Sequence, residues 1–121
     1  KAHFGLGNGL MMKGDLDLAL AEYRKSAQLD PKFAFPYLNI ANIQMQTKNI
    51  PAAIENFEKA LSINPSMPTV HLSLGMVYHQ FQGNNEKTLG HLKESLRLAP
   101  DQPRAESIRS LIQELENKQP T

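Results

Sequence analysis

The segment 38–46, LNIANIQMQ, sets side-chain amides and a methionine beside Leu and Ile, and these residue types are suited to binding chemistry. An Asn amide can donate a hydrogen bond to a peptide unit and accept one from it. Methionine is flexible and adapts to apolar side chains of imprecise shape. The alternation of apolar and polar residues suggests a strand at first, but amides and Met suit neither a strand core nor an ordinary helix surface. The segment therefore predicts a surface that recognises the shape and the backbone of a bound peptide more than its charge.

Other residues that could do chemistry form no catalytic or metal-binding pattern. None of the histidines pairs with another at i, i+4, and no nearby carboxylate completes a zinc-type set. The GxG spacing of Gly5, Gly7 and Gly9 lies in an expected helix rather than in a strand-to-helix turn, so it predicts no phosphate loop. We therefore expect no enzyme, no metal and no cofactor. The histidines are His3, His71, His79 and His91.

Composition limits the possible partners. The 121 residues suit one compact domain, and 13 basic residues nearly balance 12 acidic ones, so we expect no nucleic-acid partner. No apolar run approaches the roughly 20 residues of a membrane span, so we expect no direct membrane insertion. The chain contains no Cys, which excludes disulfides and thiol catalysis. Because it begins at Lys1 without Met, we expect a processed or cut-out piece of a soluble protein, with a cytoplasmic location favoured and the compartment left open.

The elements that would position these residues follow from an internal repeat. ALAEYRKSAQLDP ends at Pro31 and AIENFEKALSINP ends at Pro65, 34 residues later, while a weaker copy, TLGHLKESLRLAP, ends at Pro100. Each copy has apolar residues at helical spacing and stops at a proline, which cannot comfortably continue a helix. A second helical stretch precedes each copy. The pattern predicts helices at 2–12, 16–29, 34–47, 51–63, 68–82, 85–98 and 102–117, with Asp15, Asn49 and Asn85 as N-caps.

This repeat resembles the tetratricopeptide repeat family over roughly residues 2 to 100. The family pattern has a bulky residue, Leu-Gly and an aromatic, then Ala, an aromatic four residues on and a closing Pro. The matching positions hold His3, Leu6, Gly7, Leu10, Ala19, Tyr23 and Pro31, then Tyr37, Ile40, Ala41, Gln44, Ala53, Phe57 and Pro65, then His71, Leu74, Gly75, Tyr78, Thr88, Leu92 and Pro100. The resemblance implies an all-α, right-handed solenoid of three helix-turn-helix pairs in one domain, 1–121. Its repeats would span about 1–33, 34–67 and 68–102. It also implies that His3 and His71 pack between helices.

Three departures from the family pattern lead to local predictions. Gln44 replaces an aromatic, which predicts looser or water-bridged packing in the second repeat. Thr88 replaces Ala at a tight crossing, which predicts a shift of the last helix pair. One residue is inserted between Tyr78 and Gly83, so we expect a longer or locally irregular helix there.

The two ends of the repeat array differ. After Pro100, an apolar stripe that includes Ile108, Leu111 and Leu115 predicts a C-terminal capping helix at about 102–117. No such cap precedes the first repeat. Upstream repeats, a partner or self-association would therefore have to cover that end.

In the family, the first helix of each pair lines the concave surface. Turning about 100° per residue from Tyr37 puts Ile40, Ala41 and Gln44 on the packed face. The opposite side holds Leu38, Asn39, Asn42, Met45 and Gln46, with Phe35. The resemblance thus implies a nearly uncharged peptide-binding groove. Its predicted residues are Phe4, Asn8 and Met12, then Phe35, Leu38, Asn39, Asn42, Met45 and Gln46, then Leu72, Ser73, Met76, His79 and Gln80.

Two of these residues match the carboxylate clamp with which co-chaperone members hold chaperone C-termini. Asn8 and Asn39 occupy the positions of its asparagines, but Phe4, Thr69 and Ser73 stand where its cations would be. Without those cations a terminal carboxylate has little to pair with. The departures argue against a chaperone tail as the ligand.

The sequence thus predicts a protein-interaction module whose partner is a segment of another protein. Two alternatives stay open. The first is a structural scaffold that self-associates through its uncapped N-terminal repeat into a homo-oligomer. The second is a regulatory segment of a larger enzyme. The polar groove residues could also be merely solvated.

Overall fold

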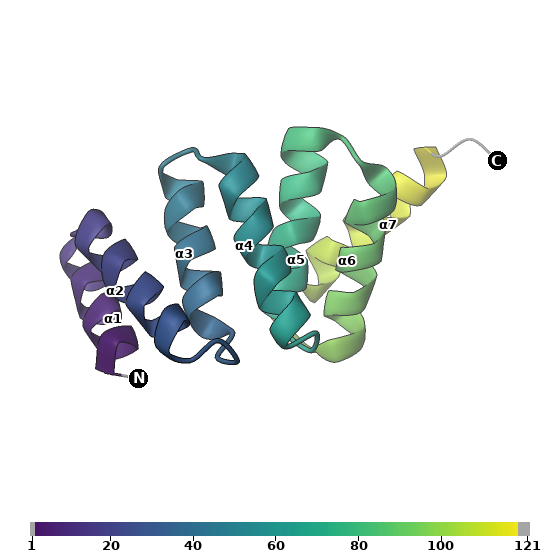
Figure 1. Cartoon of the computed structure of the whole chain (residues 1–121). Coiled ribbons are helices and arrows are strands. Elements are labelled where there is room, and N and C mark those ends of the chain that lie inside the picture. Colours follow the sequence, from purple (N-terminus) through teal and green to yellow (C-terminus); the bar gives the residue numbers. More distant parts are fainter. Residues whose placement is uncertain (1, 119–121) are drawn as a thin grey trace. The chain divides into compact units, whose positions relative to one another are not determined.

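The computed structural model describes residues 2–118, and every regular element in that range is helical (Figure 1). This confirms the all-α class. The predicted domain limits, residues 1 and 121, lie outside the described range. The elements are α1 (Ala2–Lys13), α2 (Leu16–Leu29), α3 (Phe35–Gln46), α4 (Ile50–Ile63), α5 (Pro68–Val77), the π-helical segment η1 (Tyr78–Gln82), α6 (Asn85–Leu98) and α7 (Ala105–Lys118).

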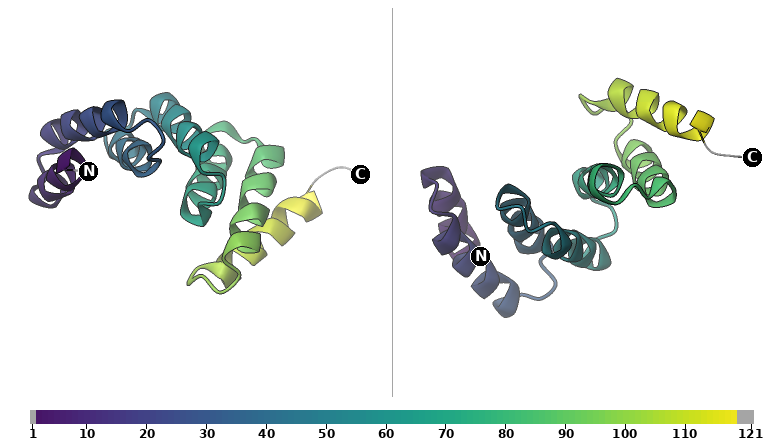
Figure 2. Two further views of the ribbon diagram at one scale, coloured as in Figure 1. Left: turned by 60° about the horizontal axis from the view of Figure 1, so that its bottom comes forward. Right: turned by 90° about the horizontal axis from the view of Figure 1, so that it is seen from above.

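The helices belong to two compact units, which meet in the sequence between Pro65 and Ser66. In the first unit α1 pairs with α2, α3 pairs with α4, and α2 also packs on α3 (Figure 2). In the second unit α5 pairs with α6, and α7 packs on α6. Three helix pairs followed by a seventh helix is the predicted order.

The first unit is held together by interlocking apolar side chains. Ala19 and Tyr23 of α2 form a buried cluster with Ile40 and Ile43 of α3. Small residues at the crossings let the helices approach closely. Gly7 is buried against the Tyr23 ring, so any side chain at position 7 would collide with it.

The second repeat replaces an aromatic contact with a hydrogen bond. Gln44 is buried, and its Oε1 accepts a hydrogen bond from Asn56 Nδ2 of α4 at 2.9 Å. A neighbouring amide thus satisfies the buried acceptor directly, and looser or water-bridged packing elsewhere around Gln44 stays a prediction.

The residue inserted in the third repeat is absorbed by the π-helical segment η1. The backbone N–H groups of Gly83 and Asn84 both point to the carbonyl of Tyr78, which widens the last turn. The predicted irregularity of this helix is confirmed. Asn84, not Asn85, caps α6, because its side chain accepts from the Lys87 backbone N–H at 3.1 Å. The prediction for Asn85 was wrong by one residue.

The α5–α6 pair is joined by histidines. His71 Nδ1 lies 3.0 Å from His91 Nδ1, and the His91 ring stacks on Tyr78 with 5.8 Å between ring centroids. His71 is buried, as its repeat position implies. Thr88 is buried and turns its hydroxyl back to the Asn84 carbonyl at 2.8 Å, which satisfies the polar atom within α6.

The C-terminal helix α7 covers α6 with a short apolar stripe. Ala105, Ile108 and Leu115 are buried, and Lys93 of α6 pairs with Glu116 of α7 at 2.7 Å. The helix starts at residue 105, three residues later than predicted. Gln102 instead caps the end of α6, since its Nε2 donates to the Ala99 carbonyl at 2.9 Å and to the Ser95 carbonyl at 3.2 Å.

The turn inside each helix pair requires a left-handed backbone. Gly14 and Gly83 meet this requirement with φ of 86° and 57°, but in the second pair the residue is Lys48, with φ of 66°. A residue with a side chain loses about 1–2 kcal/mol of folding free energy in this left-handed conformation, and Gly does not. Gly in turn lowers stability by roughly 0.5–1 kcal/mol, because it gives the unfolded chain more conformational entropy. We expect Lys48→Gly to raise the free energy of unfolding by about 0.5–1 kcal/mol in urea titrations.

Lys32 provides the control for this substitution. It is an exposed lysine in the connection between α2 and α3 and does not have a positive φ. Lys32→Gly should therefore be neutral or slightly destabilising. If both substitutions lowered stability, strain at Lys48 would be contradicted.

Candidate functional site

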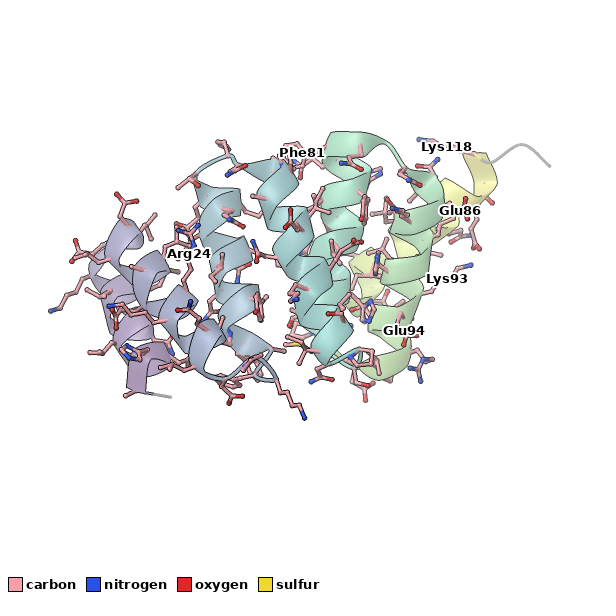
Figure 3. All side chains as sticks on the ribbon, in the orientation of Figure 1. Arg24, Phe81, Glu86, Lys93, Glu94 and Lys118 are labelled. Carbon is pink, nitrogen blue, oxygen red and sulfur yellow. The ribbon has the colours of Figure 1, made fainter. Side chains whose placement is uncertain are left out.

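Charged side chains are concentrated on the second helices of the pairs. Neither α3 nor α5 contains Asp, Glu, Lys or Arg, and α1 has only Lys13 at its last position. Figure 3 labels Arg24 on α2 and Lys93 and Glu94 on α6. The first helices therefore present uncharged surfaces, as the sequence predicts for a groove.

The predicted site residues of the first unit lie on α1 and α3 with varied exposure. Met12 is 90% exposed and Phe35 is 48% exposed, which leaves considerable apolar area in contact with water. The amide-bearing Asn8 and Gln46 are exposed as well. The half-buried members are Phe4, Leu38, Asn39, Asn42 and Met45.

The structure brings Asn8 and Asn39 together, although 31 residues separate them. Asn39 Nδ2 donates to Asn8 Oδ1 at 3.2 Å, and the Tyr23 hydroxyl donates to the same oxygen. Burial raises the pKa of the Tyr23 phenol, and a side-chain hydrogen bond with Asn39 opposes that shift. We name Asn8 and Asn39 the amide pair.

An aromatic cluster adjoins the amide pair through Tyr23. The Phe4 ring lies 5.7 Å from the Tyr23 ring, 5.0 Å from Phe33 and 6.4 Å from Phe35, measured between centroids. Phe33 and Phe35 meet edge to face at 5.8 Å. Such tilted arrangements suit aromatic rings, and they hold the half-exposed Phe35 in a defined position.

The second unit carries its predicted site residues on α5 and η1. Leu72, Ser73 and Met76 of α5 and His79 of η1 are half-buried, and Gln80 of η1 is exposed. Phe81, next in the chain, is 47% exposed. This surface is again uncharged and mixes apolar area with polar groups.

Two residues that complete the first unit's arrangement were not predicted as site residues. Tyr23 was assigned only to repeat packing, and its hydroxyl contact depends on how α2 lies against α1. Phe33 lies in the connection before α3, outside the helical wheel on which the prediction was based. The F-x-F spacing of Phe33 and Phe35 could have pointed to it.

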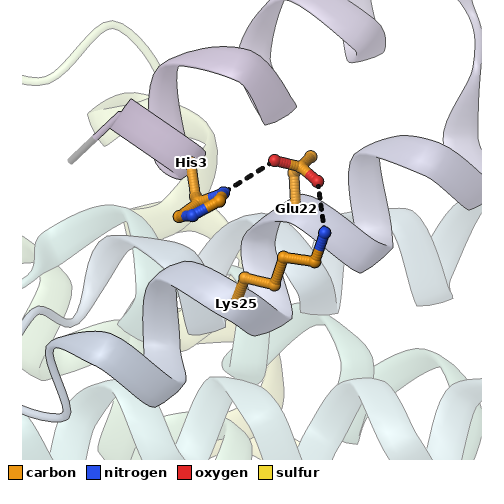
Figure 4. A network of polar contacts seen from close by, with 3 residues as sticks. All are labelled: His3, Glu22 and Lys25. Atoms are coloured by element: carbon orange, nitrogen blue, oxygen red, sulfur yellow. Dashed lines mark hydrogen bonds and ion pairs between the residues drawn. The ribbon is translucent and has the colours of Figure 1, made fainter.

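The Glu22 carboxylate joins α1 to α2 (Figure 4). Its Oε1 lies 2.8 Å from His3 Nδ1, and its Oε2 accepts from Lys25 Nζ at 3.2 Å. The hydrogen bond with His3, followed by the one with Lys25, holds the pKa of the Glu22 carboxyl below its usual value. His3 therefore has a structural partner, in agreement with its packing position in the repeat.

Two surface depressions in the first unit lie away from the predicted site. One, of about 340 Å³, lies among α2, α3 and α4, and the second, of about 450 Å³, lies between α3 and α4. Both include Tyr37 and Asn56, both mix polar and apolar surface, and neither includes a member of the amide pair. Arg24 is the charged residue that lines the first, whereas Glu55, Glu58 and Lys59 line the second.

Within residues 2–118, no three or more His, Asp or Glu side chains gather closely enough to hold a metal ion. No helix in that range combines the length and the apolar character that crossing a membrane requires.

Known proteins share both the repeat pattern and the fold. The family pattern of the tetratricopeptide repeat matches residues 1–33, and a second pattern, described as a TPR repeat, matches residues 42–80. Together the two matches cover more than half of the chain.

Two of the curated relatives are similar to most of this chain but are much longer than it is. The CTR9 homolog of Arabidopsis thaliana is 28% identical over 106 residues, which is 83% of this chain and 10% of that protein. Small glutamine-rich tetratricopeptide repeat-containing protein 2 of Saccharomyces cerevisiae is 30% identical over 95 residues, which is 78% of this chain and 27% of that protein. The chain thus spans only about a tenth to a quarter of these relatives.

A solved structure has the same fold. The first TPR of Spaghetti (RPAP3), bound to the HSP90 peptide SRMEEVD, superimposes with a TM-score of 0.81 at 20% identity, covering 96% of this chain and 89% of that one. The repeat spacing, the paired helices and the family matches agree, and the chain belongs to the tetratricopeptide repeat family.

Proposed function

We propose that this chain is a protein-interaction module, forming one repeat domain, which holds an extended segment of another protein on the uncharged surface of its first helices. In the first unit this surface comprises the amide pair, Phe4, Phe35 and Leu38. The observation that carries the proposal is the meeting of Asn8 and Asn39 beside half-exposed aromatic rings. Exposed apolar area of this kind usually marks an interaction site.

The likeness to a peptide-bound structure supports this function, because a chain of the same fold was solved bound to a peptide. The chemistry of the ligand should differ, however. Phe4, Thr69 and Ser73 stand where a carboxylate clamp carries cations, so an acidic C-terminal tail would lack charged partners. The uncharged face of α5 and η1, with Leu72, Ser73, Met76, His79 and Gln80, offers a second surface of the same kind.

Self-association is the alternative that a specific observation favours. Leu6 of α1 is 57% exposed, whereas the residues at its repeat position, Ile40 and Leu74, are 3% and 0% exposed. A second copy or another repeat could cover Leu6. Light scattering over a range of protein concentrations would show an increase in mass if copies of this chain associate.

The test of the proposed function uses peptides selected from a random dodecapeptide library by binding to this chain. Asn39→Ala removes groups that can form two hydrogen bonds, each with a net value of about 0.5–1.5 kcal/mol, so we expect binding to weaken about 5- to 150-fold in calorimetric titrations. Leu38→Asp should abolish binding, because it places a charge on an apolar contact. Because Leu38 and Asn39 are half-buried and Asn39 donates to Asn8, unfolding curves measured in parallel must show that both variants are folded before their binding is compared.

Leu29→Asp is the matched control, since Leu29 is 72% exposed on α2 and outside the proposed surface. It should leave binding unchanged. If Asn39→Ala and Leu38→Asp bound the selected peptides as tightly as the parent does, another surface would be the site.

A further inference from the structure

The second repeat leaves open a contact that side chains close in the other two repeats. In each repeat, one position on the first helix can meet one position on the second helix. The pairs at these positions are His3 with Glu22, Tyr37 with Asn56, and His71 with His91. In the first and third repeats the two side chains are joined by hydrogen bonds of 2.8 Å and 3.0 Å. Within residues 2–118 no such bond joins Tyr37 to Asn56, whose amide is used elsewhere.

The Asn56 amide has one orientation. Its Nδ2 donates to Gln44 Oε1 at 2.9 Å and to the Ala52 carbonyl at 3.1 Å. Because a backbone carbonyl can only accept, the nitrogen must face Ala52, and the amide cannot exchange its oxygen and nitrogen without losing this bond. Asn56 Oδ1 thus remains an acceptor with no hydrogen-bond partner among the described residues, and the Tyr37 hydroxyl has none there either.

The space beside this open contact consists of the two depressions described above. Tyr37 and Asn56 line both of them, so the depressions meet at these two residues. We name them together the Tyr37 groove. The first has a volume of about 340 Å³, within the range of about 300–1,000 Å³ that is usual for ligand pockets. Ala27 of α2 and Ile40 of α3 add apolar surface to it.

The charges of the Tyr37 groove differ between its two ends. The first depression is lined by Arg24, which is exposed and has no ion pair within residues 2–118, and by the Gln28 amide. The charged residues of the second depression are Glu55, Glu58 and Lys59. A free guanidinium can hold a carboxylate through two parallel hydrogen bonds. A carboxylate would therefore be attracted at the Arg24 end and would meet two acidic residues at the other end.

We propose that the Tyr37 groove is a second binding site, which takes an acidic segment of a partner protein. An Asp or Glu carboxylate of the segment pairs with Arg24, and a backbone N–H of the same segment donates to Asn56 Oδ1. Where the segment continues over the second depression, its residues are uncharged or basic. Neither depression includes Leu38 or the amide pair, so this site is separate from the uncharged surface of the first helices and does not depend on the proposed function.

The experiment selects peptides that require Arg24. A random dodecapeptide library is first depleted of the peptides that bind Arg24→Glu, and the remainder is selected for binding to the parent chain. Because Arg24 is exposed and has no ion pair within the described range, Arg24→Glu should fold, which unfolding curves check. We expect the selected peptides to be enriched in Asp and Glu. They are then synthesised with acetylated and amidated ends, so that only their side chains carry charge.

A double-mutant cycle identifies the carboxylate that meets Arg24. Each acidic residue of a selected peptide is replaced by its amide, and affinities are measured by calorimetric titration. One replacement should lower affinity for the parent chain about 2- to 5-fold, the upper part of the range for an exposed ion pair. The same replacement should leave affinity for Arg24→Gln unchanged. A Lys at that peptide position should bind Arg24→Glu more tightly than it binds the parent.

Lys13→Glu is the matched control for charge. Lys13 is an exposed cation at the end of α1, in the same unit, and it lines neither depression. Lys13→Glu should change the affinity of the selected peptides less than about 2-fold. A folded Leu38→Asp should bind them as the parent does. In NMR titrations, the backbone amide signals of Tyr37 and Asn56 should shift, whereas those of the amide pair should not.

Several results would overturn this inference. They are the failure of any peptide to survive the depletion, an acid-to-amide effect of equal size in Arg24→Gln, and equal weakening by Lys13→Glu and Arg24→Glu. Loss of binding to a folded Leu38→Asp would place these peptides on the surface of the first helices instead. Association of the parent but not of Arg24→Glu in light scattering would make a second copy the occupant in place of a partner segment. Failure of the proposed function alone would leave these measurements unaffected.

Discussion

Phe57→Ala should lower the free energy of unfolding by about 3–5 kcal/mol, the usual cost of removing a buried aromatic ring. Phe57 is 1% exposed in α4 and is among the largest fully buried side chains of the described range. Its removal leaves a cavity that neighbouring helices fill only in part. Because the free energy of unfolding of such domains is only about 5–15 kcal/mol, the variant should unfold at a markedly lower urea concentration than the parent.

Phe81→Ala is the matched control for ring removal. Phe81 lies in η1 and is 47% exposed, so we expect a change within about 0.5 kcal/mol. If Phe57→Ala and Phe81→Ala lowered the free energy of unfolding by similar amounts, the difference in burial between the two rings would be contradicted.

Gly7→Ala should destabilise the first unit, whereas the same substitution at the nearby glycines of α1 should not. A Cβ on Gly7 would lie 2.6 Å and 2.8 Å from two carbons of the Tyr23 ring, which its hydroxyl bond holds in place. Overpacking of this kind costs about 1–3 kcal/mol. A Cβ added to Gly5 or Gly9 would have no such neighbour within 4 Å, so Gly5→Ala and Gly9→Ala should each add roughly 0.5–1 kcal/mol from helix propensity alone.

The collision at Gly7 can be tested by a double substitution. In the second repeat Ala41 and Phe57 occupy the positions of Gly7 and Tyr23, and both are buried. Tyr23→Phe frees the ring from Asn8 and should therefore recover part of the loss caused by Gly7→Ala, as measured by chemical denaturation. Strict additivity of the two changes would show that the hydroxyl does not hold the ring.

The sequence by itself determined the helices and their repeat. The spacing of Pro31, Pro65 and Pro100 and the periodic apolar residues placed the helix limits within a few residues, because helix formation depends on local spacing and on local stop signals. The inserted residue before Gly83 likewise predicted an irregular helix, and η1 is that irregularity. The helical wheel also predicted which side chains of the first helices form a nearly uncharged face.

Tertiary structure decided the contacts that depend on how one helix lies against another. The Gln44–Asn56 bond, the Tyr23–Asn8–Asn39 network and the His71–His91 contact join side chains 12 to 31 residues apart, and no local pattern specifies which atoms meet. The choice of Asn84 over Asn85 as a cap was settled by the widened turn before it. Helix α7 starts late because Gln102 is used to cap α6. Local periodicity shows which face of a helix packs, but the meeting of Asn8, Tyr23 and Asn39 depends on how α1, α2 and α3 lie against one another.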